Sequence, residues 1–183
     1  MLTEHERDTL LSIAREAIAA SLDRRPIPQG GPLSGRLGEA GGAFVTIRLH
    51  GELRGCIGYI ESELPLCAVV AQVAVKAALD DPRFPPLTKW EFEQSVLEVS
   101  LLSPLQTLDN VENVKVGEHG LLIELGLHRG LLLPQVAVEN HWDREEFLMN
   151  TARKAGLPPS AWRDPRAKLY VFTAEVIHEV AVE

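Results

Sequence analysis

The chain has 183 residues and a formal net charge of −8 at pH 7, and 45% of its residues are hydrophobic. This composition is that of a globular protein, which excludes collagen-like, coiled-coil and disordered chains. The acidic balance, with no cluster of Lys and Arg, makes nucleic acid an unlikely partner, because phosphate backbones are bound by basic patches.

Targeting and metal-binding signals are absent from the sequence. The N-terminus lacks the basic start and apolar core of a signal peptide, and the least charged stretch, Leu64–Val75, is too short to span a bilayer. Two cysteines, Cys56 and Cys67, provide neither a disulfide framework nor the paired pattern of a structural zinc site. We therefore expect a cytoplasmic protein with no membrane anchor, no metal and no other cofactor.

The N-terminal part of the chain predicts one helix and one loop. Thr3 and Glu6 fit a capping box, and apolar residues recur at helical spacing as far as Leu22, which predicts a helix over residues 1–22. Residues 23–42 are rich in proline and glycine and predict a surface loop that leads into the main body, residues 43–183.

The main body begins with a predicted hairpin, Ala43–Leu49 and Glu52–Ile60, joined across His50–Gly51. A helix should follow, with Pro65 in its first turn and its end near Leu79. A second capping box, Asp143 with Glu146, predicts another helix that ends at Gly156. Five further strands are expected, at Ser95–Ser103, Val114–Val116, Gly120–Leu125, Leu131–Val136 and Lys168–Ile177. Because strands and helices do not alternate regularly, we predict an α+β fold with a mainly antiparallel sheet and flanking helices in a single domain.

The segment Leu53-Arg54-Gly55-Cys56-Ile57-Gly58 is the most unusual part of the chain. Glycines inside a strand are typical of places where another backbone or a ligand approaches closely. A period of two puts Arg54, Cys56 and Gly58 on one face, so we expect the guanidinium to favour the reactive thiolate and the glycine to leave room for a small molecule. The alternative is an inert, buried thiol, which is our interpretation of Cys67 in the apolar stripe of its helix.

This segment, together with Asp81-Pro82-Arg83-Phe84-Pro85-Pro86, resembles the AMMECR domain family. The resemblance covers residues from about 43 to the C-terminus, and the first helix fits the usual start of the family. Further matches are Val99-Ser100-Leu101-Leu102, His119-Gly120, Leu132-Leu133-Pro134-Gln135-Val136, Trp142-Asp143 and Lys154-Ala155-Gly156-Leu157-Pro158.

The resemblance implies a two-lobed α+β fold, with a smaller inserted lobe, an interlobe cleft and the cysteine motif near that cleft. It implies no established reaction. In many prokaryotes the domain is similar to protein A of the AmmeMemoRadiSam system, whose other components resemble a Memo protein and a radical-SAM enzyme.

Two functions from different classes stay open. One is a cysteine-dependent enzyme in which Cys56 is the nucleophile, His119 the base and Glu124 the group that orients the imidazole. Strand parity places His119 and Glu124 on opposite faces, which counts against this trio, and Glu98 is the substitute for Glu124.

The other function, which we favour because every such triad is weak, is a component that binds a small ligand or a partner segment for the Memo-like and radical-SAM-like proteins. Asp81 and Arg83 can orient a ligand, but we slightly favour an ion pair that braces their turn while Phe84 fills the core. Gln135 can contact a ligand or the backbone at a sheet end. The candidate ligand-binding residues are Arg54, Gly55, Gly58, Asp81, Arg83 and Gln135.

Overall fold

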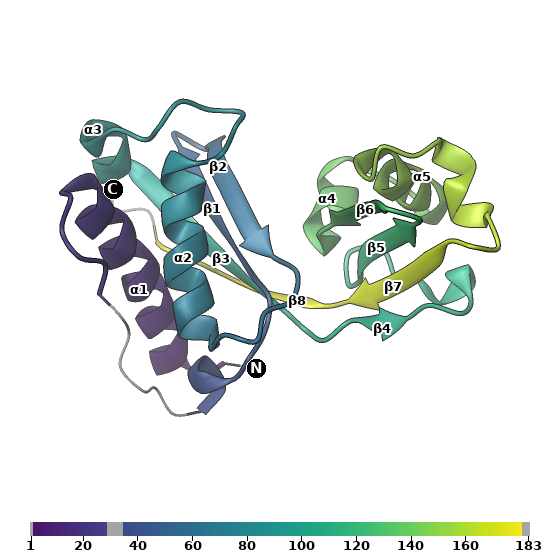
Figure 1. Cartoon of the computed structure of the whole chain (residues 1–183), viewed down its shortest axis with the longest axis horizontal. Coiled ribbons are helices and arrows are strands. Elements are labelled where there is room, and N and C mark those ends of the chain that lie inside the picture. The colour runs from purple at the N-terminus through teal and green to yellow at the C-terminus, as the bar shows by residue number, and fades with distance from the viewer. Residues whose placement is uncertain (1, 29–34, 181–183) are drawn as a thin grey trace. The chain divides into compact units, whose positions relative to one another are not determined.

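A computed structural model describes residues 2–28 and 35–180 of the chain. The chain divides into two compact units. The first unit runs as far as Leu102 and resumes at Glu175, and the second comprises residues 103–174, so the second is inserted into the sequence of the first (Figure 1). Each unit contains a four-stranded antiparallel sheet with helices, which confirms the predicted α+β class.

The first unit has a sheet with the strand order β2-β1-β3-β8. Its strands are β1 (Ala43–Leu49), β2 (Glu52–Tyr59), β3 (Ser95–Leu102) and β8 (Ala174–His178). Its helices are α1 (Glu4–Leu22), the 3-10 helix η1 (Gly35–Gly38), α2 (Leu66–Leu79) and α3 (Lys89–Glu93). Helices α1 and α2 lie side by side on one face of this sheet (Figure 1), and the core of the unit lies between them and the strands.

Helix α1 forms where the sequence predicts it. Thr3 is its N-cap, the backbone N–H of Thr3 donates to the carboxylate of Glu6 at 2.8 Å, and the Thr3 hydroxyl accepts from the N–H of Glu6 at 3.3 Å. Its apolar face is buried against α2. Pro65 is the N-cap of α2 and not part of its first turn. Of the predicted loop 23–42, residues 29–34 lie outside the described residues, and the 3-10 helix η1 at Gly35–Gly38 is a short regular element that was not predicted.

The predicted hairpin of β1 and β2 is confirmed. His50 and Gly51 both have a positive φ, 52° and 85°, as a two-residue type I′ turn requires. The register shifts by one residue between Ile47 and Arg48, so that Arg54 of β2 has no partner on β1. Such a bulge breaks the simple alternation of faces along β2.

The second unit has a sheet with the order β4-β7-β5-β6. Its strands are β4 (Gln106–Thr107), β5 (Gly120–Leu125), β6 (His128–Leu132) and β7 (Lys168–Phe172). Its helices are α4 (Pro134–Glu139), α5 (Arg144–Lys154) and the 3-10 helices η2 (Val111–Asn113) and η3 (Pro159–Arg163). The capping box of Asp143 and Glu146 is confirmed, and Gly156, at φ 74°, ends α5 as predicted.

Three predicted strands are wrong. Residues Val114–Val116 lead into a turn and form no strand. Leu131–Val136 is divided between β6 and α4, because Pro134 begins a helix. Lys168–Ile177 is two strands of two different sheets, β7 and β8, separated by Thr173. No described helix is long and apolar enough to cross a membrane.

Candidate functional site

Cys56 lies on β2, the edge strand of the first sheet, and is partly exposed. Its cross-strand neighbour is Thr46 of β1, whose hydroxyl donates to Cys56 Sγ at 3.2 Å. A Cβ on Gly55 would lie 2.2 Å from the carbonyl oxygen of Ala77 in α2, so Gly55 faces that helix. Because neighbouring residues in a strand face opposite ways, the Cys56 thiol lies on the sheet face away from α2.

The backbone of Cys56 is held by two side chains of the turn that follows α2. Its N–H donates to Asp81 Oδ2 at 2.9 Å, and its carbonyl oxygen accepts from Arg83 Nη2 at 3.3 Å. Asp81 and Arg83 therefore supply the bonds that a further strand would make at the open edge of β2.

Asp81 and Arg83 form the ion pair that the sequence predicts for their turn. Arg83 donates through Nε to Asp81 Oδ1 at 3.0 Å and through Nη2 to Oδ2 at 2.7 Å. This pairing, more than any other contact, lowers the pKa of Asp81 to about 2. The Asp81 side chain is 2% exposed and that of Arg83 is 50% exposed, so the buried carboxylate is permanently charged at neutral pH while its cation reaches solvent.

Phe84 does not fill the core, in contrast to the expectation from the sequence. Its side chain is half-buried, and its ring centre lies 5.7 Å from the guanidinium of Arg54 and 5.6 Å from that of Arg83. Leu87 is the residue of this turn that enters the core. Phe84 is thus a shared cation–π partner of two arginines.

Arg54 does not activate the thiol, which corrects the sequence-based expectation. It is buried, and it donates to Glu91 of α3 through Nε at 2.8 Å and Nη2 at 3.1 Å. This contact, more than any other, lowers the pKa of Glu91 to about 2. Burial raises the pKa of the Cys56 thiol, and the cation that offsets part of this effect is Arg83. The β-bulge removes Arg54 from the regular pairing of β2, so simple alternation along the strand does not place Arg54 on the face of Cys56.

The space that a side chain would take at each motif glycine is filled by the protein itself, so that space is not the room for a ligand that the sequence led us to expect. A Cβ at Gly58 would lie 2.2 Å from the ring of Phe44, its cross-strand neighbour. Gly55 is needed because the backbone of α2 approaches it at Ala77. Both positions are explained by packing, and ligand binding by Gly55 and Gly58 stays a prediction.

Polar side chains continue across this sheet face from the thiol. Thr46 lies opposite Cys56 on one side and opposite Glu98 of β3 on the other. The Glu98 carboxylate lies 3.8 Å from the guanidinium of Arg48, and its charge raises the pKa of Cys56. In the next cross-strand row, Ser100 is fully buried and its hydroxyl has no hydrogen-bond partner among the described residues. This face can donate and accept hydrogen bonds around a protonated thiol.

The proposed partners of Cys56 in catalysis, His119 and Glu124, belong to the second unit. His119 Nδ1 accepts from the backbone N–H of Lys115 at 3.3 Å, and Glu124 pairs with Arg129 at 2.8 Å. No hydrogen bond joins His119 to Glu124 in the described part of the chain. The catalytic trio stays a prediction, and so does a ligand contact by Gln135, which lies in the first turn of α4.

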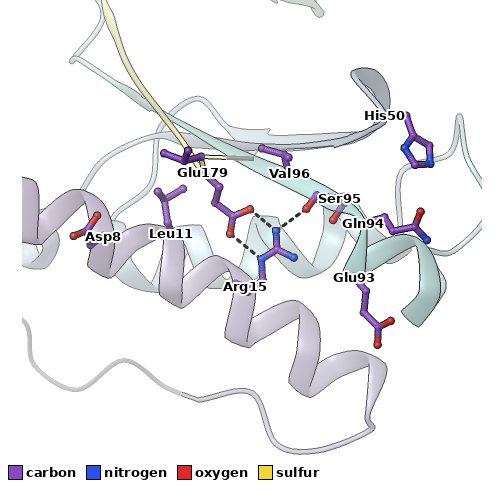
Figure 2. A pocket seen from close by; sticks show the side chains of 10 residues that line it. Asp8, Leu11, Arg15, His50, Glu93, Gln94, Ser95, Val96 and Glu179 are labelled. Atoms are coloured by element: carbon purple, nitrogen blue, oxygen red, sulfur yellow. Dashed lines mark hydrogen bonds and ion pairs between the residues drawn. The ribbon is translucent and has the colours of Figure 1, made fainter. Parts of the chain in front are cut away.

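An open hollow of about 760 Å³ in the first unit was not predicted from the sequence. Figure 2 shows Arg15 of α1 at its centre, where Arg15 donates through Nε to Glu179 Oε1 at 2.7 Å and through Nη2 to the carbonyl oxygen of Ser95 at 2.9 Å. The hollow is lined by Asp8, Leu11, Arg15, His50, Glu93, Gln94, Ser95, Val96, Glu179 and Val180. Because these residues come from distant segments, no motif reveals them. Arg15 is already paired, so the hollow offers no free guanidinium to a ligand.

No group of three or more His, Cys, Asp and Glu side chains suited to a metal ion occurs among residues 2–28 and 35–180.

Comparisons with known proteins cover both units. A family model described as AMMECR1 matches residues 11–177. A protein of Methanothermobacter thermautotrophicus is 44% identical over 186 residues, which cover 97% of this chain and 96% of that protein. Protein MK0488 of Methanopyrus kandleri is 43% identical over 187 residues, which cover 97% of this chain and 90% of that protein. The crystal structure of uncharacterized protein PH0010 from Pyrococcus horikoshii has a TM-score of 0.93 and 39% identity, and it covers 98% of this chain and 94% of that one.

Proposed function

Since the chain belongs to the AMMECR1 family, we propose that it is a binding component, without covalent chemistry of its own, that acts with Memo-like and radical-SAM-like proteins. The observation that carries the proposal is the state of Cys56. Its thiol is protonated at neutral pH because burial raises its pKa, and its hydrogen-bond partner, Thr46, is a donor and not a base.

The charged residues of the motif also suit binding better than catalysis. Arg54 is paired with Glu91, and Arg83 is paired with Asp81. Both carboxylates have a lowered pKa, so neither is suited to accept a proton near pH 7. These residues build a rigid edge on the sheet, beside a face that carries Thr46 and a protonated Cys56. Such an arrangement supports recognition of a small ligand or of a partner segment.

The alternative is a cysteine-dependent enzyme with Cys56 as the nucleophile. Two contacts favour it, since the Thr46 hydroxyl and the Arg83 cation each lower the pKa of the thiol. Burial outweighs both. We infer a cytoplasmic location, where a reducing environment keeps Cys56 and Cys67 as free thiols.

Co-purification tests the proposal. The tagged full-length chain is co-expressed with the Memo-like and radical-SAM-like proteins of the same organism, and complexes are isolated in parallel with Cys56→Ala. We expect at least one of the two proteins to associate with the wild type and, to a similar degree, with Cys56→Ala. Absence of any association, with and without cell extract as a source of small ligands, overturns the proposal. If both the wild type and Cys56→Ala associate with these proteins, but only Cys56→Ala loses the function of the protein in the cell, the enzyme is the favoured alternative.

A further inference from the structure

In its regular part, from Cys56 to Tyr59, the free edge of β2 has two positions with outward-facing backbone groups. In an antiparallel pair, residues alternate between those that bond to the partner strand and those whose N–H and C=O point away from it. The bonds of Cys56 to Asp81 and Arg83 show that Cys56 points away from β1. The register is regular from Cys56 to Tyr59, so Gly58, two residues later, also points its backbone groups outward.

These two positions are treated differently by the fold. Asp81 and Arg83 cover Cys56, whereas no group outside the ladder with β1 bonds to the N–H or C=O of Gly58 in the described part of the chain. Gly58 is partly exposed, and Phe44 covers only the sheet face at this residue. With no side chain of its own, Gly58 leaves its backbone groups accessible from the edge.

Arg83 has unused donors beside this open edge. Its Nε and Nη2 are bonded to Asp81 and to the carbonyl of Cys56, while its Nη1 has no partner among the described residues. Half of its side chain is exposed. A guanidinium with two free N–H groups is a ready partner for a carboxylate.

We propose that an extended, carboxylate-bearing peptide segment of a partner protein adds to the edge of β2, bonding to the backbone of Gly58 and placing its carboxylate on Arg83 Nη1. This inference rests on the proposed function, because it specifies how the binding component holds a partner. Addition of a strand to a free sheet edge is a general mode of peptide recognition. The Asp81–Arg83 pair stops the added strand at Cys56, which puts the carboxylate at or near the end of the paired segment.

Amide hydrogen exchange of the full, ¹⁵N-labelled chain tests the proposal directly, with the partner that co-purifies as the probe. We expect saturation with that partner to slow exchange of the Gly58 amide at least about tenfold. The amides of Cys56 and Ile57 are internal references, because they are already bonded to Asp81 and within the ladder to β1.

Arg83→Ala should weaken the association by about tenfold, as expected for loss of a charge-assisted hydrogen bond. Arg166→Ala is the matched control, since Arg166 forms the same local pair with Asp164 in the other unit, and it should have no effect. Association without protection of Gly58 overturns this inference and leaves the proposed function standing, whereas no association overturns both.

Discussion

The carboxylate of Asp81 accepts the backbone N–H of Cys56 at 2.9 Å. This bond distinguishes Asp81-Pro82-Arg83 from a second copy of the same tripeptide, Asp164-Pro165-Arg166. In both copies the arginine donates to its own aspartate through the backbone N–H, Nε and Nη2, at distances between 2.7 and 3.1 Å. The ion pair is therefore a local property of the tripeptide, and only the first copy uses it to hold a distant strand.

Asp81→Asn should destabilise the chain, whereas Asp164→Asn should not do so measurably. Asp81 is buried and bonds to Cys56 as well as to Arg83, so its replacement weakens several bonds in a place that water cannot reach. We expect a loss of about 2 kcal/mol in the free energy of unfolding, measured by urea denaturation. Equal effects of the two substitutions would mean that the bond to Cys56 contributes nothing.

The contribution of Asp81 should also depend on pH. Its pKa is lowered from 3.8 to about 2 in the folded chain, mainly by Arg83, so its stabilising effect is complete above about pH 5 and is lost progressively as the pH falls toward 2. The difference in stability between wild type and Asp81→Asn should therefore shrink on acidification from pH 6 to pH 3. Urea denaturation at a series of pH values measures it, and a difference that stays constant contradicts the assignment.

The elements that could be predicted from the sequence are those with local causes. Thr3 and Glu6 cap α1 in the folded chain as their spacing indicates, and the hairpin of β1 and β2 forms because His50 and Gly51 adopt the left-handed turn conformation. Thr88 and Glu91 carry the same capping signature at α3, a helix that the sequence did not predict. Their helix has only five residues and no apolar repeat to draw attention to it.

The errors at the site have long-range causes. The face of Arg54 depends on a bulge that exists only in the pairing with β1, and its partner, Glu91, lies 37 residues away. The need for Gly58 comes from the ring of Phe44 across the hairpin. Neither relationship can be found by counting along one strand, because each depends on which strands meet.

The Cys56 thiol should react slowly at neutral pH. In a Cys67→Ala background, the rate of alkylation by iodoacetamide should rise with a midpoint above the ordinary thiol pKa of about 8.5, because burial raises the pKa of Cys56. Thr46→Val removes the hydroxyl that donates to Sγ and should move the midpoint higher still. A midpoint below 8 would restore the nucleophile hypothesis.

Alanine at the two motif glycines should be harmful for different reasons. Gly58→Ala clashes mainly with the side chain of Phe44 and also with the backbone oxygen of Ala43, whereas Gly55→Ala clashes with the backbone oxygen of Ala77. Overpacking of this kind costs about 1–3 kcal/mol. Phe44→Ala should partly rescue Gly58→Ala, with a coupling of about 1 kcal/mol in a double-mutant cycle, and should not rescue Gly55→Ala. Rescue of both variants, or of neither, contradicts this account.

Two ion pairs from α1, one to Glu175 in β8 and one to Glu179 directly after β8, hold the strand that follows the inserted unit. Arg7 pairs with Glu175 at 3.0 Å, and Arg15 bonds to Glu179 at 2.7 Å. Arg7 and Arg15 are eight residues apart, which is about 12 Å along a helix, and Glu175 and Glu179 are four residues apart, which is about 13 Å along an extended chain. The two ion pairs therefore match in spacing, and the helix and the extended segment run in the same direction. Glu179 also accepts the backbone N–H of Leu97 in β3 at 2.8 Å.

Glu179→Gln should therefore loosen β8 as well as remove one ion pair. Its partner Arg15 is largely covered, and the amide of the variant can replace only part of the three contacts that Glu179 makes to α1 and β3. We expect a loss of about 2 kcal/mol in the free energy of unfolding and faster amide exchange in β8. Glu145→Gln, which removes the exposed pair with Arg163, is the control and should change neither quantity. If β8 exchanges at the same rate in Glu179→Gln as in the wild type, the strand is held by its ladder with β3 and not by α1.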